Sequence, residues 1–449
     1  MSKPLNTDRK PKSRQLGDPP PPVSPPMATI QDDDELLLAR IGYKQELRRE
    51  FSKWSTVSYA ISILGVLGSV PATLGQPLIV GGPATAVWCW LIGSIMALAI
   101  GSSVAELVSA YPTAGGMYYV TKHVVPPGQV PLFAWTQGWC NLLGQTAGVS
   151  SVAYTVSQML LACVSMNSDL IDGEYSYSPM SEETHDAAVR GPVAIKTAVL
   201  VSGAFGWLLT VSMCFCLTDF EGILNSPTGL PAAQIFLNAG GRTGGTVMWA
   251  FAILVQFFTG CSAMLADTRM AYAFARDNAL PFSDFLAKVN PYTHTPVNAV
   301  WFVVFFSISL NLIAIGSTET ALAIFSVTAP ALDISYVSVI LAHQIYKHKV
   351  KFIEGPFTLG RWGTLINYIA VVWVLFISTI LFFPSQLPVT PANMNYAICV
   401  AAFIAIFAFV WWFVAARGKY TGPQTNDIIN EIPSEDNDDD CEEPDDFSV

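Results

Sequence analysis

The sequence predicts an all-α membrane protein whose chain crosses the bilayer about nine times. Only 13% of its 449 residues are charged and 52% are hydrophobic, whereas soluble domains carry about 25% charged residues. Nine apolar runs are long enough to cross a hydrocarbon core of about 30 Å as helices that rise about 1.5 Å per residue. These observations argue against a soluble enzyme, a nucleic-acid-binding protein and a disulfide-stabilised scaffold.

The nine runs follow one another along the middle of the chain. The third is predicted to be one long helix, because no polar turn divides it. In order, the spans are expected at Thr56–Val80, Ala84–Ala110, Val130–Met166, Val193–Leu217, Thr246–Phe274, Val297–Ile315, Thr320–Ile345, Leu365–Phe383 and Met394–Val414.

Both ends of the chain are expected to lie outside this transmembrane domain, which covers residues 54–420. Residues 1–31 are rich in Lys, Arg and Pro and predict a disordered cytoplasmic tail. Residues 32–53 begin with acids and end with bases, which suits the helix dipole and predicts an amphipathic helix on the membrane surface. Residues 421–449 contain 11 Asp and Glu but no Lys or Arg. This predicted disordered tail therefore accounts for the whole net charge of −11.

The residue types that catalysis and metal binding require do not form a pattern. The eight Cys are scattered, and Cys214 and Cys216 are too close for a zinc-binding pattern and lack His partners. No paired nucleophile and base, and no phosphate-binding loop, can be found. The sequence predicts no enzyme activity, no metal and no cofactor.

Basic residues in the connections indicate how the spans are oriented, because short cytoplasmic loops collect Lys and Arg. By this criterion the N-terminus and the loops that contain Lys122, Arg276 and Lys349 are all cytoplasmic. Strict alternation of nine spans would instead place Arg276 and Lys349 outside. Either an odd number of crossings is missing between the third and fourth spans, or one half of the protein inserts against its charge bias.

Several segments resemble the GABA and choline permeases of fungi, within the amino acid–polyamine–organocation superfamily. The most specific is AELVSAYPTAGGMYY, and the others are GYKQEL, LNSPTGLP, AFARD and TPVN. They begin in that order at Ala105, Gly42, Leu224, Ala273 and Thr295. The resemblance covers about residues 42–420. It implies a fold of 12 helices with two inverted five-helix repeats, and uptake of a small amine such as an amino acid, GABA or choline, coupled to protons.

The same resemblance accounts for the orientation conflict. Met180–Glu183 resembles the loop after the family's sixth helix, yet it follows the third span here. The equivalents of helices 4–6 would then be absent between residues 166 and 191. Three helices are an odd number, as the charge pattern requires.

A Gly-rich interruption of the first span is the predicted substrate-binding element. Gly65, Val66, Leu67, Gly68 and Ser69 precede Pro71. A break in mid-membrane frees backbone groups that are tolerated only where they line a cavity or are buried in protein, and broken helices bind substrates in transporters with inverted repeats. Close packing of small residues is the alternative.

Trp135 and Trp139 are four residues apart, on one face of the third span. Aromatic faces can bind an alkylammonium or choline group by cation–π attraction, worth about 0.5–2 kcal/mol, so both residues are candidates for substrate binding. Packing, or a position at the membrane interface, is the alternative.

Three carboxylates and one Arg are predicted to have roles other than substrate binding. Asp333 lies midway along an apolar span, where a carboxylate is costly unless paired or protonated, so it is a candidate for proton coupling; a hydrogen-bonded neutral acid is the alternative. Glu106 ends the second span, and Arg276 and Asp277 form an internal turn. These three are expected to be structural or gating residues.

Two functions from different classes follow. The first is a plasma-membrane permease for amino acids, GABA or choline-like amines, with protons, the substrate and the lipid bilayer as partners and no nucleic acid. The second is a shortened, non-transporting form that associates with or regulates a full-length permease and is retained in the endoplasmic reticulum. The sequence leaves the oligomeric state open.

Overall fold

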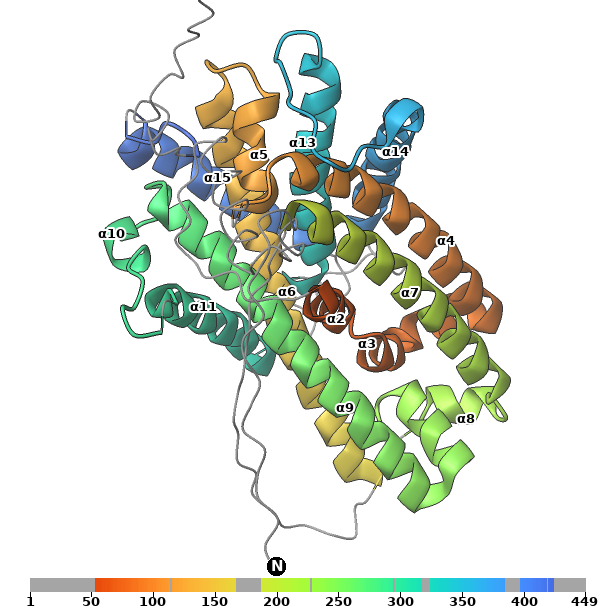
Figure 1. Ribbon diagram of the computed structural model, residues 1–449. Coiled ribbons are helices and arrows are strands. Elements are labelled where there is room, and N and C mark those ends of the chain that lie inside the picture. The colour runs from red at the N-terminus through yellow and green to blue at the C-terminus, as the bar shows by residue number, and fades with distance from the viewer. Residues whose placement is uncertain are drawn as a thin grey trace, which may run out of the picture.

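The computed structural model describes residues 53–113, 115–166, 187–226, 228–293, 295–316, 324–383, 396–417 and 419–423, and in this part of the chain the regular elements are all helices (Figure 1). The predicted tail at 1–31, nearly all of the surface helix at 32–53, the Met180–Glu183 loop, and all but the first three residues of the predicted tail at 421–449 lie outside the described residues.

The helices are numbered as in Figure 1. Their bounds are α2 Lys53–Leu64, α3 Val66–Thr73, α4 Gly75–Ala110, α5 Gly116–Val124, α6 Val130–Met166, α7 Ala187–Phe215, α8 Phe220–Leu224, α9 Pro231–Arg276, α10 Ser283–Leu286, α11 Val297–Gly316, α13 Thr328–Tyr346, α14 Gly363–Leu381 and α15 Ala397–Trp411. A 3₁₀ turn at Gly360–Trp362 precedes α14, and a π-helical turn at Trp412–Ala416 follows α15.

The prediction of a polytopic all-α membrane protein is confirmed. Among the described residues, eight helical segments are long and apolar enough to cross a membrane. The one remaining predicted span, the sixth, corresponds to α11, whose apolar stretch Val297–Ile313 is shorter. The third span is one continuous helix of 37 residues, α6, as expected.

Two predicted boundaries were wrong. The first span ends at Thr73 rather than Val80, and residues 75–80 form a helical lead into α4. A kink at Gly82, which has a φ of 68° and precedes Pro83, separates these residues from the rest of α4, which is the second span. The fifth span begins at Pro231 rather than Thr246, because a short helix joins α9 through a kink at Gly241, where φ is 65°. Glycine alone tolerates these backbone angles without strain.

The side-chain contacts fix the direction of each helix. We call the end of the bundle that contains Lys122, Arg276, Lys347 and Arg417 the basic end. At this end Tyr118 of α5 hydrogen-bonds Tyr420, which follows α15, and Phe357, which follows α13, donates its N–H to Ser109 of α4. The basic connections of both halves thus lie together, as the charge pattern predicts for cytoplasmic loops.

Helices α6 and α7 are consecutive in the chain and run in the same direction. Helix α7 starts at the basic end and is antiparallel to α4, since Val199 approaches Gly101 and the Trp90 indole donates to the carbonyl of Gly203. Helix α6 also starts at the basic end and reaches the opposite end, where the carbonyl of Met159 accepts from the Trp249 indole. Consecutive membrane helices with one intervening loop run antiparallel, so the orientation conflict of the sequence is present in the fold.

The core has three main parts along this bundle. One cluster joins α6, α9 and α15 near the basic end, a second joins α4, α5, α13 and α14, and a third joins α3, α4, α7 and α9 at the opposite end. Figure 1 shows α6 and α9 crossing the length of the molecule side by side. Helix α9 of this pair is the one against which the interrupted first helix, α2 and α3, packs.

Candidate functional site

The predicted interruption of the first span is present. Helix α2 ends at Leu64 and α3 begins at Val66, with Gly65 between them in the left-handed conformation (φ 46°, ψ 45°). Glycine adopts this conformation without the strain that a Cβ would impose. The break therefore forms where the sequence has a glycine.

Side chains of α9 complete the hydrogen bonding of the break. The hydroxyl of Thr259 donates to the carbonyl of Ser62 at 2.9 Å, an acceptor just before the interruption. Beyond the break, the hydroxyl of Ser69 donates to the side-chain oxygen of Gln256 at 3.1 Å. Polar residues of α9 thus supply partners in mid-membrane, where a missing hydrogen bond is costly.

Glycines allow α9 to approach this closely. A Cβ at Gly65 would collide with the Thr259 side chain, and a Cβ at Gly68 would lie 2.8 Å from the backbone nitrogen of Gln256. At either position a Cβ would be closer to α9 than van der Waals contact allows. The close packing that was the alternative interpretation is therefore present, although it does not exclude a binding role for the same residues.

Part of the break is left exposed. Leu67 is 56% exposed and Leu64 is 39% exposed, whereas Gly65 and Gly68 are buried. Val66 and Ser69 are half-buried. The predicted substrate-binding residues therefore pack against α9 and, among the other described helices, against α7, while Leu67 is left exposed.

Trp135 and Trp139 lie in a cluster of aromatic rings near the basic end. They are 2% and 9% exposed, and their ring centroids are 5.9 Å apart. Both rings contact Phe274 of α9, and the Trp135 indole donates to the carbonyl of Ala408 in α15. Both also line an apolar cavity of about 470 Å³ between α6, α13 and α15, to which no charged residue contributes.

The structure does not bring the two predicted parts of the substrate site together. The Trp pair contacts Phe274, while the break contacts Thr259, fifteen residues earlier on α9. At 1.5 Å per residue this is about 22 Å along the helix. One small substrate cannot contact both, and substrate binding at either remains a prediction.

Asp333 is half-buried on α13, next to a polar contact between α13 and α6. Its neighbour Ser335 accepts a hydrogen bond from Asn141 at 3.0 Å. Gln137 of α6 lies nearby, is 3% exposed, and has no side-chain partner among the described residues. These polar groups lie beside Ser335 and not against Asp333, whose role in proton coupling stays a prediction.

A second intramembrane carboxylate, Asp267 of α9, was missed from the sequence. It is fully buried, and its Oδ2 accepts a hydrogen bond of 2.9 Å from Thr146 of α6. Its Oδ1 has no partner in the described part of the chain. It lies on α9 between the break and the Trp pair. Asp267 falls within the predicted span Thr246–Phe274, but it lies close to the end of that span, next to Thr268 and Arg269, and was not singled out as a site residue.

Glu106 connects the two halves of the protein at the basic end. Its Oε1 accepts the backbone N–H of Leu359 at 2.9 Å, while Ser109 and Tyr111 accept those of Phe357 and Ile353. We call these three contacts the α4 clamp. It gives Glu106 the kind of structural contact that was expected, whereas a role in gating remains a prediction.

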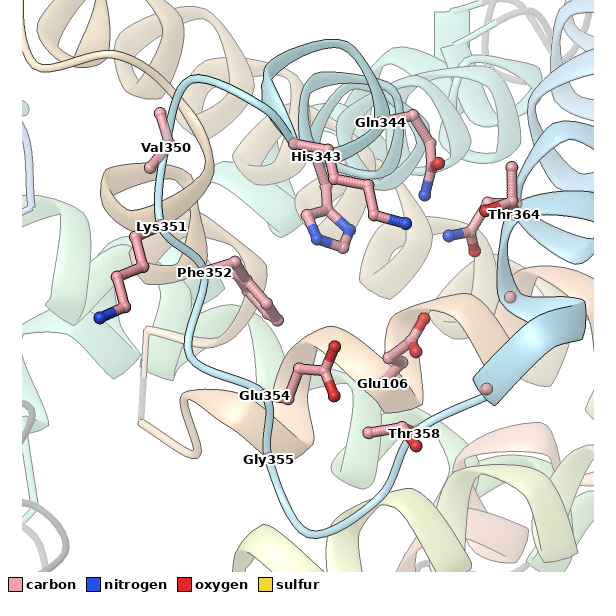
Figure 2. A pocket seen from close by; sticks show the side chains of 14 residues that line it. Glu106, His343, Gln344, Val350, Lys351, Phe352, Glu354, Gly355, Thr358 and Thr364 are labelled. Atoms are coloured by element: carbon pink, nitrogen blue, oxygen red, sulfur yellow. The ribbon is translucent and has the colours of Figure 1, made fainter.

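A polar cavity of about 410 Å³ adjoins the α4 clamp (Figure 2). Glu106 and Glu354 direct their carboxylates into it, and His343 faces them from α13. Lys347, Thr364 and Asn367 also line the cavity; the complete lining is Glu106, His343, Gln344, Lys347, Val350, Lys351, Phe352, Glu354, Gly355, Thr358, Gly360, Gly363, Thr364 and Asn367.

Arg276 and Asp277 form an ion pair of 3.2 Å where α9 ends. Asp277 is fully buried and interacts with the Tyr118 hydroxyl, which lies 2.7 Å from the hydroxyl of Tyr420. Burial raises the pKa of both phenols, so both remain protonated and serve as hydrogen-bonding groups. The turn thus anchors the chain after α15, in line with the expected structural role.

No group of three or more His, Cys, Asp or Glu within the described residues could hold a metal ion. The reactive groups of the described residues likewise do not assemble around a common substrate position. The arrangement offers polar groups and carboxylates inside a membrane bundle.

Comparison with known proteins finds a matching family model, several related permeases and a solved structure. The model of the amino acid permease family matches residues 51–170 and 170–407. The chain is 37% identical to an uncharacterized amino-acid permease of Schizosaccharomyces pombe and 31% identical to amino-acid permease 2 of Neurospora crassa, and each match covers 90% of this chain and 92% of the relative. It is 27% identical to the GABA-specific permease of Saccharomyces cerevisiae, over 88% of this chain and 86% of that one. A solved structure of an Eremococcus coleocola manganese transporter matches 84% of the chain and 98% of its own, with 12% identity and a TM-score of 0.38.

The same alignments contain a large gap. The Schizosaccharomyces pombe relative aligns over 499 positions. Ninety per cent of the 449-residue chain fills about 404 of them, so about 95 positions have no residue here. The family match divides at residue 170, which lies between α6 and α7. Three helices of about 20 residues each plus loops would be of this total size, and their absence between α6 and α7 stays a prediction.

Proposed function

The chain belongs to the amino acid permease family, an integral membrane family of transporters rather than enzymes, and on that premise we propose that its fold carries small amine solutes across the membrane by secondary active transport. Amino acids are the substrate class that the relatives support, and GABA and choline-like amines are narrower proposals. Protons are the proposed coupling ion, and the plasma membrane is the proposed site of action.

The observation that carries this proposal is the interrupted first helix packed on α9. Left-handed Gly65 ends a helix in mid-membrane, and Thr259 and Gln256 supply polar partners on either side. A membrane protein tolerates such a break only where it lines a cavity or is covered by protein. In transporters, half-helix N-termini at such breaks face the carboxylate of the substrate.

Two buried carboxylates are available for proton coupling. Asp333 is the candidate from the sequence, and Asp267 is more deeply buried and lies eight residues after Thr259 on α9, the helix that packs on the break. A carboxylate without a cationic partner is most stable as the neutral acid inside a membrane bundle. Uptake and release of a proton at either residue would therefore accompany its exposure to water.

A specific observation favours a second candidate function, a shortened form without transport activity. Helices α6 and α7 run in the same direction, and the family match divides between them at residue 170. In addition, about 95 positions of the alignment to the Schizosaccharomyces pombe relative have no residue in this chain, and Leu67 is exposed beside the break. The missing segment would supply the other half of the substrate site. This form would associate with or regulate a full-length permease, and we expect retention in the endoplasmic reticulum.

One experiment separates the two. The chain and a version restored with the corresponding segment of about 95 residues from the Neurospora crassa relative are expressed with a fluorescent tag in yeast that lacks its own GABA and choline permeases. Surface fraction and uptake of radiolabelled GABA, choline and amino acids are measured. Uptake only by the restored form supports the non-transporting role of this chain. Equal uptake by both forms refutes that role, and no uptake by either refutes the proposed substrates.

A further inference from the structure

We propose that the polar cavity beside the α4 clamp is a second binding site, for a free amino acid on the side of the membrane where the basic end lies. It is separate from the helix break, since neither Gly65 nor Ser69 lines it. At about 410 Å³ it falls within the range of small-molecule sites, which is about 300–1,000 Å³. The proposal concerns binding and does not depend on transport by this chain.

The first argument is the presence of charges of both signs across the cavity. Glu106 and Glu354 lie close enough to repel one another, and Lys347 attracts Glu106. Figure 2 shows both carboxylates facing the open centre, with His343 opposite and the amine of Lys351 turned away. Within the described residues no ion pair of 4.0 Å or less joins these acids to Lys347.

A ligand with one ammonium and one carboxylate matches this arrangement. Its ammonium would lie between Glu106 and Glu354 and relieve their repulsion, and its carboxylate would approach Lys347. A simple anion would face two carboxylates, and a simple cation would leave Lys347 without a partner. Charge-assisted hydrogen bonds of this kind are roughly twice as strong as neutral ones.

The second, independent argument is an unpartnered polar side chain in the wall. Asn367 of α14 lines the cavity, is only 3% exposed, and has no partner for its Oδ1 among the described residues. The Nδ1 of His343, across the cavity, is likewise without a partner in this part of the chain. Buried polar groups are nearly always hydrogen-bonded. A ligand that fills the cavity with donors and acceptors satisfies both.

The site lies between the two halves of the protein, so a ligand bound there would affect how they are held together. Its walls come from the end of α4, the end of α13, the 350–359 segment and the start of α14, so it joins helices of both halves. A bound amino acid would connect Glu106 to Glu354 and reinforce the α4 clamp. Accumulated amino acid would thereby favour the conformation in which the basic end is closed, by the ordinary linkage between binding and conformation.

The test uses a cysteine reporter in sealed inside-out vesicles. Thr364→Cys places a thiol on the exposed first turn of α14 at the cavity, and Tyr292→Cys places one at a 92% exposed position between α10 and α11, away from the cavity. Labelling by a charged, membrane-impermeant maleimide is followed over time, with the labelling of the parent chain subtracted. The probes are GABA, butyrate, which lacks the ammonium, and butylamine, which lacks the carboxylate.

We expect GABA to slow labelling at position 364 but not at 292, and butyrate and butylamine to have no effect at the same concentration. Glu354→Gln and Lys347→Gln should each raise the GABA concentration for half-maximal protection about tenfold or more, because each removes a hydrogen bond to a charged group. A GABA-induced rise in the thermal stability of the parent chain, absent in Glu354→Gln, provides a readout without the reporter. Absence of both effects overturns the proposal, as does equal protection by all three probes or undiminished protection in both charge variants. Failure of transport alone leaves these readouts unchanged.

Discussion

The contact between the broken helix and α9 predicts a large cost for one added methyl group. In Gly68→Ala, the new Cβ would lie 2.8 Å from the backbone nitrogen of Gln256 and 2.7 Å from its Cβ. Ordinary contact begins near 3.4 Å, so α3 must move about 0.6 Å away from α9. Overpacking of this kind costs about 1–3 kcal/mol.

The same movement strains the hydrogen bond from Ser69 to Gln256, whose net contribution is about 1 kcal/mol. We therefore expect Gly68→Ala to lower the free energy of unfolding by about 2–4 kcal/mol. The measurement is unfolding of the purified protein in mixed micelles titrated with SDS. Removal of the Gln256 side chain should not restore stability, because the backbone nitrogen remains in the way.

Gly93→Ala is the matched control, since Gly93 is also helical and a Cβ there would meet nothing within 4 Å. Alanine in that position should stabilise the protein by about 0.5–1 kcal/mol through its higher helix propensity. If Gly68→Ala were as stable as the parent chain, or if Gly93→Ala were destabilised equally, the close approach of α3 and α9 would be wrong.

Three further predictions follow. In the restored form, we expect both Asp333→Asn and Asp267→Asn to reach the cell surface. Uptake should lose its pH dependence in the variant whose carboxylate carries the coupled proton, and unchanged pH dependence in both variants would remove these two carboxylates from coupling. Burial lowers the pKa of His123 to about 4, from 6.5, so its contribution to stability is complete above pH 6.5 and is lost as the pH falls toward 4. Between pH 7 and pH 5 we expect a loss of about 2 kcal/mol, which His123→Phe should remove because it eliminates the titratable imidazole while its ring can still stack on Tyr111; an equal loss in that variant would assign the pH effect to other groups. A cysteine at Tyr292 should react with an impermeant maleimide only from the cytoplasm and one at Glu221, in α8 at the opposite end, only from outside; the reverse pattern would invalidate the assigned orientation.

Hydropathy and charge predicted the fold well because both act over long stretches of chain. Runs of about 20 apolar residues defined the spans, and the loops that contain Lys122 and Arg276 lie at one end as their charge requires. The boundary at Thr73 was missed because the apolar run continues past the end of the helix into the first residues of α4. The boundary at Pro231 was missed because a helix can extend beyond the apolar run that reveals it, here through the kink at Gly241.

The candidate site was less predictable because it depends on contacts between distant segments. The break at Gly65 was evident locally, but its partners on α9 lie almost 200 residues later and carry no motif of their own. The position of Trp135 on a helix face could be predicted, yet its contact with Phe274, about 22 Å along α9 from Thr259 at the break, depends on the pairing of α6 with α9. Asp267 was missed because it lies near the polar end of its predicted span, and its full burial against Thr146 of α6 depends on how α6 and α9 pack.

The α4 clamp has a consequence for the exchange of backbone hydrogens with solvent. The segment from Ile353 to Leu359 has no regular secondary structure, so its amides would ordinarily exchange with deuterium within the dead time of an experiment. Those of Ile353, Phe357 and Leu359, however, are donated to side chains of α4 and of Tyr111 at its end. They can exchange only when this segment separates from α4, and their protection factors therefore report the free energy of that opening. Three slow amides in an irregular loop would thus measure how often the two halves of the protein come apart.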